Sequence, residues 1–205
     1  MTNCIFEPNT NLQINNEQLM NDQITTSEQY DHVIVGCKHI FLKKTADYGT
    51  SWRVYRTISI ADQIYIKAKR IRTIQEKKEQ RIEDGIKSEF EGILNYGIIG
   101  LIQLEIGAGE TEQLPLAEVE AHYNKMIVIA RQLMMDKNHD YGEAWREMSQ
   151  ESFVDLILAK ILRIKQIISN EGITVVSEGI DANFYDIINY AVFALILMEE
   201  GKQPK

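Results

Sequence analysis

The chain has 205 residues, of which 44% are hydrophobic and 25% are charged, and its net charge at pH 7 is −8. This length allows one domain or two small ones with a proper core. The acidic balance disfavours direct binding of nucleic acid through its phosphate backbone. No apolar run reaches the ~20 residues of a membrane span, so no membrane partner is expected.

The cysteines and the start of the chain bear on its compartment. Cys4 and Cys37 show no metal or redox spacing, and the first residues lack a basic region followed by an apolar run. Cysteines used in this way, without an export signal, are typical of a reducing cytosol. We therefore expect a cytoplasmic protein.

In chain order, the sequence predicts an all-α fold. Residues 1–27 are rich in Asn, Gln and Thr and predict a polar N-terminal arm, with Ser27 as the N-cap of the first helix. The whole chain has three prolines and almost no strand-type alternation, which favours long helices. The predicted helices cover about residues 27–44, 59–81, 87–106, 116–135, 152–169 and 181–199, with a linker at 107–115.

A duplicated heptapeptide reveals an internal repeat. "DYGTSWR" begins at Asp47 and "DYGEAWR" begins at Asp140, which is 93 positions later. At this offset, residues 47–76 match residues 140–169 at 12 of 30 positions, where ordinary composition would give roughly two. The similarity continues in the third helices at an offset of 94.

Two copies are too few for a solenoid, which generally needs three or more repeats. A tandem pair of three-helix units, residues 28–106 and 116–200, is instead expected to close on itself as an intramolecular pseudo-dimer. Two separate domains on a flexible linker are the weaker alternative. Each half has only about 80 residues and a very apolar third helix to cover.

The second helix of each repeat carries a lysine on its apolar stripe. An unpaired buried charge is costly, so each lysine must reach solvent or meet an anion. An arginine follows three residues later, and an aspartate lies near the start of the helix. These residues are Asp62, Lys67 and Arg70 in the first copy and Asp155, Lys160 and Arg163 in the second. They form either an internal salt-bridge set or a group of cations aimed at a phosphate.

The third helices carry polar stripes that differ between the copies. The stripe is Glu89, Gly92 and Asn95 in the first copy and Asn183, Asp186 and Asn189 in the second. Each copy therefore lacks a different acid, which predicts two unequal sites or one composite site. Carboxylates on helices of a bundle can hold Mg²⁺.

The heptapeptide is expected to be a loop between the first and second helices. Its glycine allows a positive φ, its aspartate can cap a turn, and its aromatic residues offer flat surfaces. These residues are Asp47, Tyr48 and Trp52, and Asp140, Tyr141 and Trp145. The loop either stacks on a base or forms a rigid corner with a buried tryptophan. Lys44 and Lys137, just before it, are expected to be solvated.

These motifs resemble a family named nucleotide modification associated domain 1. "KNHDYGEAWR", "LAKILRIKQI" and "DIINYA" of the second copy match its patterns well. In the first copy "KTADYGTSWR" has Thr45 in place of Asn, and "GILNYG" has Gly92 in place of the acid. The resemblance implies a role that accompanies nucleotide or DNA base modification.

A looser similarity is to all-α NTP pyrophosphohydrolases of the MazG and dimeric dUTPase type, which hold Mg²⁺ with E-x-x-E and E-x-x-D patterns. The third helices here give only E-x-x-G at Glu89 and N-x-x-D at Asn183. The second helices lack the E-x-x-E pair. This departure weakens the hydrolase interpretation.

The leading hypothesis is a nucleotide-handling protein with a pocket between the repeats. Phosphates would meet Lys67, Arg70, Lys160 and Arg163. The remaining substrate-binding residues would be Asp47, Tyr48, Trp52, Asn95, Asp140, Tyr141, Trp145 and Asn189. An enzyme of this kind would cleave a nucleoside phosphate with Mg²⁺. Its catalytic residues would be Asp62, Asp155 and Asp186, and its metal ligands Glu89, Glu178 and Asp186.

The rival hypothesis is a non-catalytic helical scaffold or partner-binding protein whose charged set is purely structural. Assembly into a homo-oligomer is compatible with either hypothesis.

Overall fold

The computed structural model describes residues 25–79, 85–107, 109, 113–173 and 178–201. Within these residues the chain forms α-helices and short 3-10 turns without any strand, which confirms the all-α prediction. The helices are α2 (Thr26–Tyr48), α3 (Thr57–Lys77), α4 (Ile86–Ile106), α5 (Leu116–Tyr141), α6 (Gln150–Ser169) and α7 (Ile180–Glu199), and the turns are η1 (Ser51–Val54) and η2 (Ala144–Glu147). Nearly all of the polar arm predicted for residues 1–27 lies outside the described residues.

The first described helix begins with a capping box. Thr25, not Ser27, is the N-cap: its Oγ1 accepts from the Glu28 backbone N–H at 3.3 Å, and Glu28 Oε2 accepts from the Thr25 N–H at 2.8 Å. The T-x-x-E spacing explains this choice, because both side chains satisfy free N–H groups at the helix start. The Ser27 hydroxyl instead accepts from Arg131 of α5.

The helices that lead into the two heptapeptide corners, α2 and α5, are longer than predicted. α2 runs to Tyr48 and α5 to Tyr141, so the first two residues of each heptapeptide are the last residues of a helix. Gly49 and Gly142 end these helices with positive φ angles of 65° and 59°. The glycine, rather than the whole heptapeptide, is therefore the point at which the chain leaves the helix.

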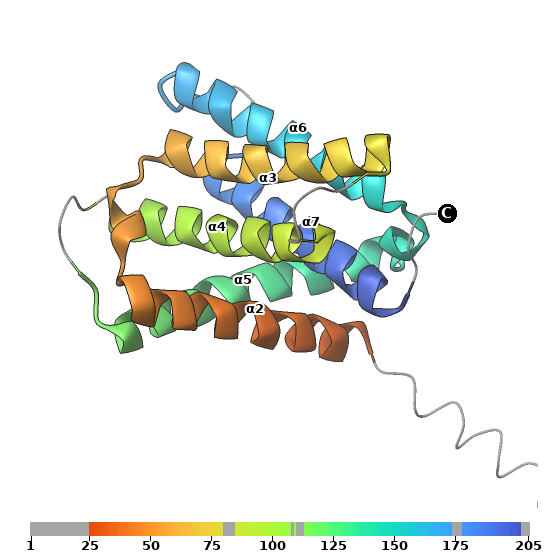
Figure 1. Ribbon diagram of the computed structural model, residues 1–205, viewed down its shortest axis with the longest axis horizontal. Helices are drawn as coiled ribbons and strands as arrows, with labels where there is room; N and C mark the ends of the chain where they lie inside the picture. Colours follow the sequence, from red (N-terminus) through yellow and green to blue (C-terminus); the bar gives the residue numbers. More distant parts are fainter. Residues whose placement is uncertain (1–24, 80–84, 108, 110–112, 174–177, 202–205) are drawn as a thin grey trace, which may run out of the picture.

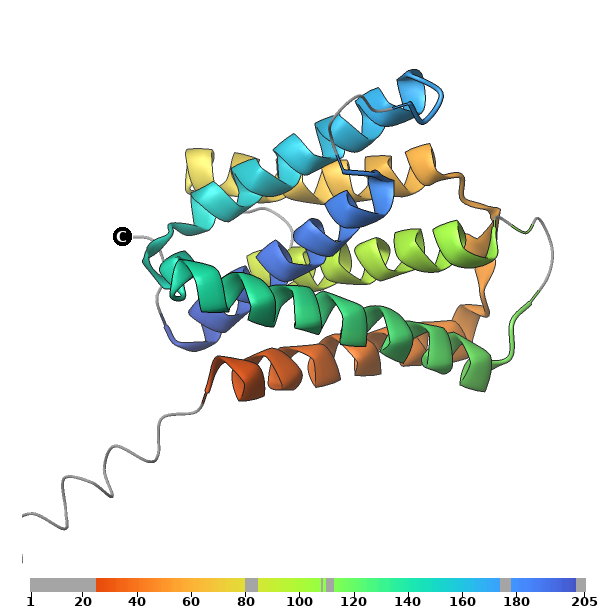
Figure 2. The ribbon, with the colours of Figure 1, turned by 180° about the vertical axis from the view of Figure 1, so that it is seen from behind.

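The helices form three layers (Figures 1 and 2). The third helices, α4 and α7, form the middle layer, between the α3–α6 pair on one side and the α2–α5 pair on the other. Each helix thus contacts its counterpart from the other repeat. One continuous hydrophobic cluster runs through both repeats.

The middle pair packs closely because α4 carries small residues where it meets α7. A Cβ at Gly97 would lie 2.8 Å from Ile188 Cγ1, and one at Gly100 would lie 2.7 Å from Phe184 Cζ. Of the described helices, α7 is long and apolar enough to span a membrane by length and composition alone. However, 78% of its most apolar stretch is buried inside the protein, as expected of a central core helix.

Reciprocal polar contacts join the repeats. Tyr30 Oη donates to Asn189 Oδ1 at 2.9 Å, and its counterpart Tyr123 Oη donates to Asn95 Oδ1 at 3.0 Å. Each amide also donates to a backbone carbonyl of its own repeat. Contacts that recur in exchange across the repeats are expected of an intramolecular pseudo-dimer.

Candidate functional site

Each repeat contains a cavity of its own, of about 420 Å³ in the first and about 520 Å³ in the second. Both are in the size range of small-molecule sites, roughly 300–1,000 Å³. The equivalent lining residues are Lys44 and Lys137, Tyr48 and Tyr141, Trp52 and Trp145, Lys67 and Lys160, Asn95 and Asn189, and Tyr96 and Tyr190. All lining residues of a cavity come from one repeat. These two cavities therefore lie within the repeats, whereas two smaller ones, of about 240 and 200 Å³, are lined by residues of both repeats. The leading hypothesis expected the pocket between the repeats.

A buried tryptophan forms one wall of each cavity. Trp52 and Trp145 are 8% and 6% exposed. Trp145 stacks on Phe193, with ring centroids 4.3 Å apart and planes 8° apart. Within the described chain, neither indole Nε1 has a hydrogen-bond partner, although both atoms are buried. A buried donor without an acceptor is costly, and the burial of both rings shows that the two tryptophans belong to the core.

The heptapeptide tyrosines lie beside these walls and are exposed. Tyr48 and Tyr141 are 70% and 74% exposed and line their cavities. Their rings are therefore available to stack on a flat ligand. Asp47 and Asp140 are exposed in the last turns of α2 and α5 and do not line either cavity.

In the first cavity the stripe lysine pairs with an acid that lies outside the lining. Lys67 Nζ is 3.0 Å from Glu89 Oε2, and Arg70 also binds the Glu89 carboxylate. Gly92 lies against the lysine stem, since a Cβ there would be 2.8 Å from Lys67 Cε. The end of Lys67 thus occupies the space beside Gly92 on the cavity wall.

In the second cavity the acid lies in the wall itself. Asp186 is buried, and both Lys137 and Lys160 bind its carboxylate. Burial alone would lower the pKa of Lys137, but the hydrogen bond and charge of Asp186 raise it above its ordinary value. Glu178 also lines this cavity and is exposed.

The position equivalent to Glu89 is Asn183, which is fully buried. Its Nδ2 donates to the Gly179 carbonyl at 2.7 Å, whereas its Oδ1 is buried without a partner in the described structure. Arg163, the counterpart of Arg70, is exposed and does not line the cavity. The two repeats therefore place their acid one helical turn apart: the equivalent lysine binds it in both, but the second cation is Arg70 in the first repeat and Lys137 in the second.

Two predicted catalytic aspartates lie elsewhere. Asp62 of α3 is 2.5 Å from Lys165 Nζ of α6, and Asp155 of α6 is 3.6 Å from Arg72 Nη1 of α3. These are reciprocal ion pairs between the repeats, and neither aspartate lines either cavity. For this part of the charged set, the structure agrees with the salt-bridge interpretation.

Of the predicted magnesium ligands, Glu178 and Asp186 line the second cavity, whereas Glu89 lines neither cavity. Glu89 and Asp186 belong to different repeats, and each carboxylate already binds two cationic side chains. Across the described ranges, no three His, Cys, Asp or Glu side chains lie together as a metal site would require. These residues do not fit a Mg²⁺ ion.

Asn95 and Asn189 line the cavities, but their amide groups serve structure. The Oδ1 of each accepts from a tyrosine of the other repeat, and the Nδ2 of each donates to a backbone carbonyl of its own repeat. They give the cavities a rigid wall rather than a free polar group.

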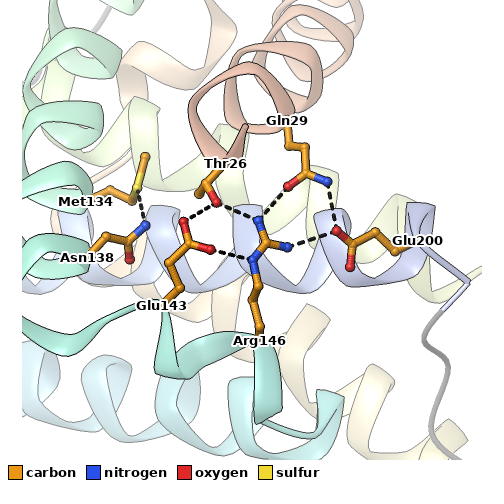
Figure 3. Close-up of polar contacts among 7 residues, drawn as sticks. All are labelled: Thr26, Gln29, Met134, Asn138, Glu143, Arg146 and Glu200. Atoms are coloured by element: carbon orange, nitrogen blue, oxygen red, sulfur yellow. Dashed lines mark hydrogen bonds and ion pairs between the residues drawn. The ribbon is translucent and has the colours of Figure 1, made fainter. Parts of the chain in front are cut away.

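Sequence reasoning missed the role of Lys137 and of the heptapeptide arginines. Lys137 was expected to be solvated but binds Asp186, a contact between residues 49 positions apart. Figure 3 shows Arg146 donating to Glu143 at 2.6 Å and to Glu200 at 2.9 Å. It also donates to Thr26 and Gln29 of α2, at 2.5 and 2.8 Å. The identity of the arginine in both copies was the only signal available.

Arg146 also covers the tryptophan of the second cavity. Its guanidinium carbon lies 4.4 Å from the centroid of the Trp145 ring, whose other partner is Phe193. A cation over an indole face is attractive. The network in Figure 3 therefore fixes one wall of the second cavity.

Comparison with protein families gives one match. The family model described as Nucleotide modification associated domain 1 matches residues 44–104 and 137–198. No curated protein and no solved structure matches the chain. The two matched segments contain most of the residues that line the two cavities.

Proposed function

The chain belongs to the nucleotide modification associated domain 1 family, with one copy in each repeat, and from this premise we propose that each repeat binds a nucleotide or nucleoside in its own cavity. The family description links the chain to nucleotide modification. The cavities supply the chemistry by which such a ligand could be recognised.

The observation that carries the proposal is the exposed tyrosine that lines each cavity beside a buried tryptophan. The rings of Tyr48 and Tyr141 are free to stack on a base, and stacking of a base on an aromatic ring contributes about 1–3 kcal/mol. Two lysines complete each cavity and suit the sugar-phosphate part of the ligand.

The proposal is one of binding and includes no hydrolytic step. Mg²⁺-assisted cleavage would need several free carboxylates around one ion. Glu89 lies outside the first cavity, Asp186 lines the second, and both are neutralised by cationic partners. Asp62 and Asp155 hold α3 to α6.

The rival function, a helical scaffold, is favoured by one observation. The reciprocal ion pairs of Asp62 and Asp155 show that part of the charged set is structural. A scaffold, however, has no need of an exposed tyrosine and two lysines lining a cavity in each repeat. Ligand binding therefore separates the two functions.

Intrinsic fluorescence tests the proposal, because Trp52 and Trp145 are the only tryptophans of the chain. The Trp145→Phe variant retains a reporter in the first cavity, and Trp52→Phe retains one in the second. Titration with nucleosides, nucleoside monophosphates and dNTPs should change the remaining fluorescence saturably. Bound ligand should also raise the Tm, because a ligand at 100 times its Kd adds about 2.7 kcal/mol to the free energy of unfolding.

A matched pair of lysine variants controls the test. Lys44 lines the first cavity, whereas its exposed neighbour Lys43 does not. Lys44→Met should weaken nucleotide binding in the Trp145→Phe background, and Lys43→Met should leave it unchanged. If neither cavity responds to any ligand at millimolar concentration, in fluorescence or in Tm, the proposed function is wrong.

A further inference from the structure

We propose that the two cavities bind different chemical classes: the first takes a phosphate-bearing nucleotide, and the second takes an uncharged nucleoside or nucleobase. This inference rests on the proposed function and adds the substrate class of each site. It depends on where each repeat places its acid relative to the cavity wall.

In the first cavity no acid stands in the wall beside the stripe lysine. Lys44 and Lys67 line it, while Glu89, the partner of Lys67, lies outside the lining. Gly92 occupies the position at which the second repeat has Asp186. A phosphate in this cavity would therefore meet less negative charge beside Lys67 than a phosphate beside Lys160 in the second cavity.

Glu91 is the one acid that lines the first cavity. It also lines a smaller cavity of about 240 Å³ that contains Lys87. Burial raises the pKa of the Glu91 carboxyl above its ordinary value, and the charges of Lys87 and Lys44 oppose that shift. Glu91 thus lies near Lys44 and Lys87, whereas Gly92 faces Lys67.

In the second cavity a phosphate would meet Asp186. This carboxylate lies in the wall and binds both cavity lysines. A bound phosphate would have to compete for Lys137 and Lys160 and would be repelled by the acid itself. Glu178 adds a second negative charge at the lining.

An uncharged base meets no such repulsion in the second cavity. A carboxylate has about four acceptor positions, and the two lysine contacts leave some of them for a ligand. The amino or imino N–H groups of a base could donate to Asp186, while the lysine ammonium groups donate to the acceptors of the same ligand. The wall thus offers both an acceptor and donors to a base edge.

The acid of the third helix occupies different positions in the two repeats, as Asn183 shows. It occupies the position of Glu89, and its buried Oδ1 has no partner within the described residues. The acid of the second repeat is instead one turn later, at Asp186. Exchanging this pair of positions between the repeats should therefore exchange the ligand preference.

The test compares nucleosides with their 5′-monophosphates, base by base, in the two single-tryptophan variants. In Trp145→Phe, the first cavity should bind the monophosphate at least about tenfold more tightly than the nucleoside, and added NaCl should reduce this preference. In Trp52→Phe, the second cavity should prefer the nucleoside. Adding Glu89→Asn and Gly92→Asp to the first background should reverse its preference.

A milder variant keeps the test valid if this double exchange prevents folding. Asp186→Asn keeps the shape of the side chain but removes its charge, so the second cavity should gain about tenfold in monophosphate affinity. The same preference in both cavities, or no gain in Asp186→Asn, would overturn the division by charge while leaving nucleotide binding intact. Absence of any binding would overturn both proposals.

Discussion

Arg53 and Arg146 end the two copies of the same heptapeptide, but they attach it to different parts of the protein. Arg53 is 6% exposed and donates to the side chain of Gln103 and to the Gly107 carbonyl, both at the end of α4 in its own repeat. Arg146 is more exposed and reaches Thr26 at the start of α2, in the other repeat. In the described chain, the arginine of the first corner therefore binds only within its own repeat, whereas the arginine of the second corner also binds the other repeat.

The glycines of the two corners also differ. Gly49 has φ 65° and ψ −155°, a region that essentially only glycine occupies, while Gly142 has φ 59° and ψ 39°, in the left-handed helical region. After Gly49, the Thr50 N–H donates to Gln113 Oε1 at 2.7 Å. Identical residues therefore fix where the helix ends, whereas neighbours outside the heptapeptide decide how the chain leaves it.

The largest difference is expected when each arginine is replaced by methionine. Arg53→Met should lower the free energy of unfolding by about 3 kcal/mol, because it leaves the buried Gln103 side-chain oxygen unpaired and removes the bond to the Gly107 carbonyl. Arg146→Met should cost about 1 kcal/mol, because water can reach its partners. Urea unfolding followed by circular dichroism measures both. Equal losses of stability in the two variants would contradict the difference in burial between the two arginines.

Alanine at the two glycines should give the next largest difference. Gly49→Ala should cost about 2–3 kcal/mol, since its backbone conformation is strained for an L-residue and its Cβ would overlap the Gln113 amide. Gly142→Ala should cost about 1 kcal/mol, because its Cβ would meet nothing within 4 Å. The same unfolding measurement applies. A cost for Gly142→Ala as large as that for Gly49→Ala would show that the backbone angles do not set the difference.

The sequence was sufficient to predict the repeat and the all-α fold, since identities at a constant offset and the scarcity of proline depend on no distant contact. It placed the ends of α2 and α5 too early, because the Asp-Tyr pair before the glycine was assigned to the loop. The sequence did not determine which groups Lys67 and Lys160 would bind. Acids at positions 89 and 186 lie one turn apart on equivalent helices, and only packing decides which one each lysine reaches.

A smaller effect is expected in the pH dependence of the free energy of unfolding, and of the two corners only the second should contribute to it. Burial raises the pKa of Glu143, but hydrogen bonds from Thr26 and Arg146 outweigh it and hold the pKa below its ordinary value of 4.5. A carboxyl with a lowered folded pKa stabilises the protein above its unfolded pKa, and this stability is lost as the pH falls through the folded value. Position 50 of the first corner is a threonine and cannot contribute in this way.

Glu143→Gln should therefore lose less stability than the wild type between pH 7 and pH 4. Urea unfolding at several pH values measures the two slopes. Glu147→Gln, an exposed position in the same 3-10 turn, controls for the removal of one negative charge. If the free energy of unfolding of Glu143→Gln falls as steeply with decreasing pH as that of the wild type, Glu143 is not the source of the pH dependence.

The smallest effect is expected for asparagine at the second glycine. Asn tolerates the left-handed helical region better than other L-residues, and the space around Gly142 is open. Gly142→Asn should change the free energy of unfolding by less than about 0.5 kcal/mol, which is less than about 2 °C in Tm. Gly49→Asn should be destabilised about as much as Gly49→Ala, because its ψ of −155° lies outside the region that Asn can adopt. The asparagine pair thus isolates the backbone angle from the lost arginine contacts, since Arg53 and Arg146 are unchanged in both variants.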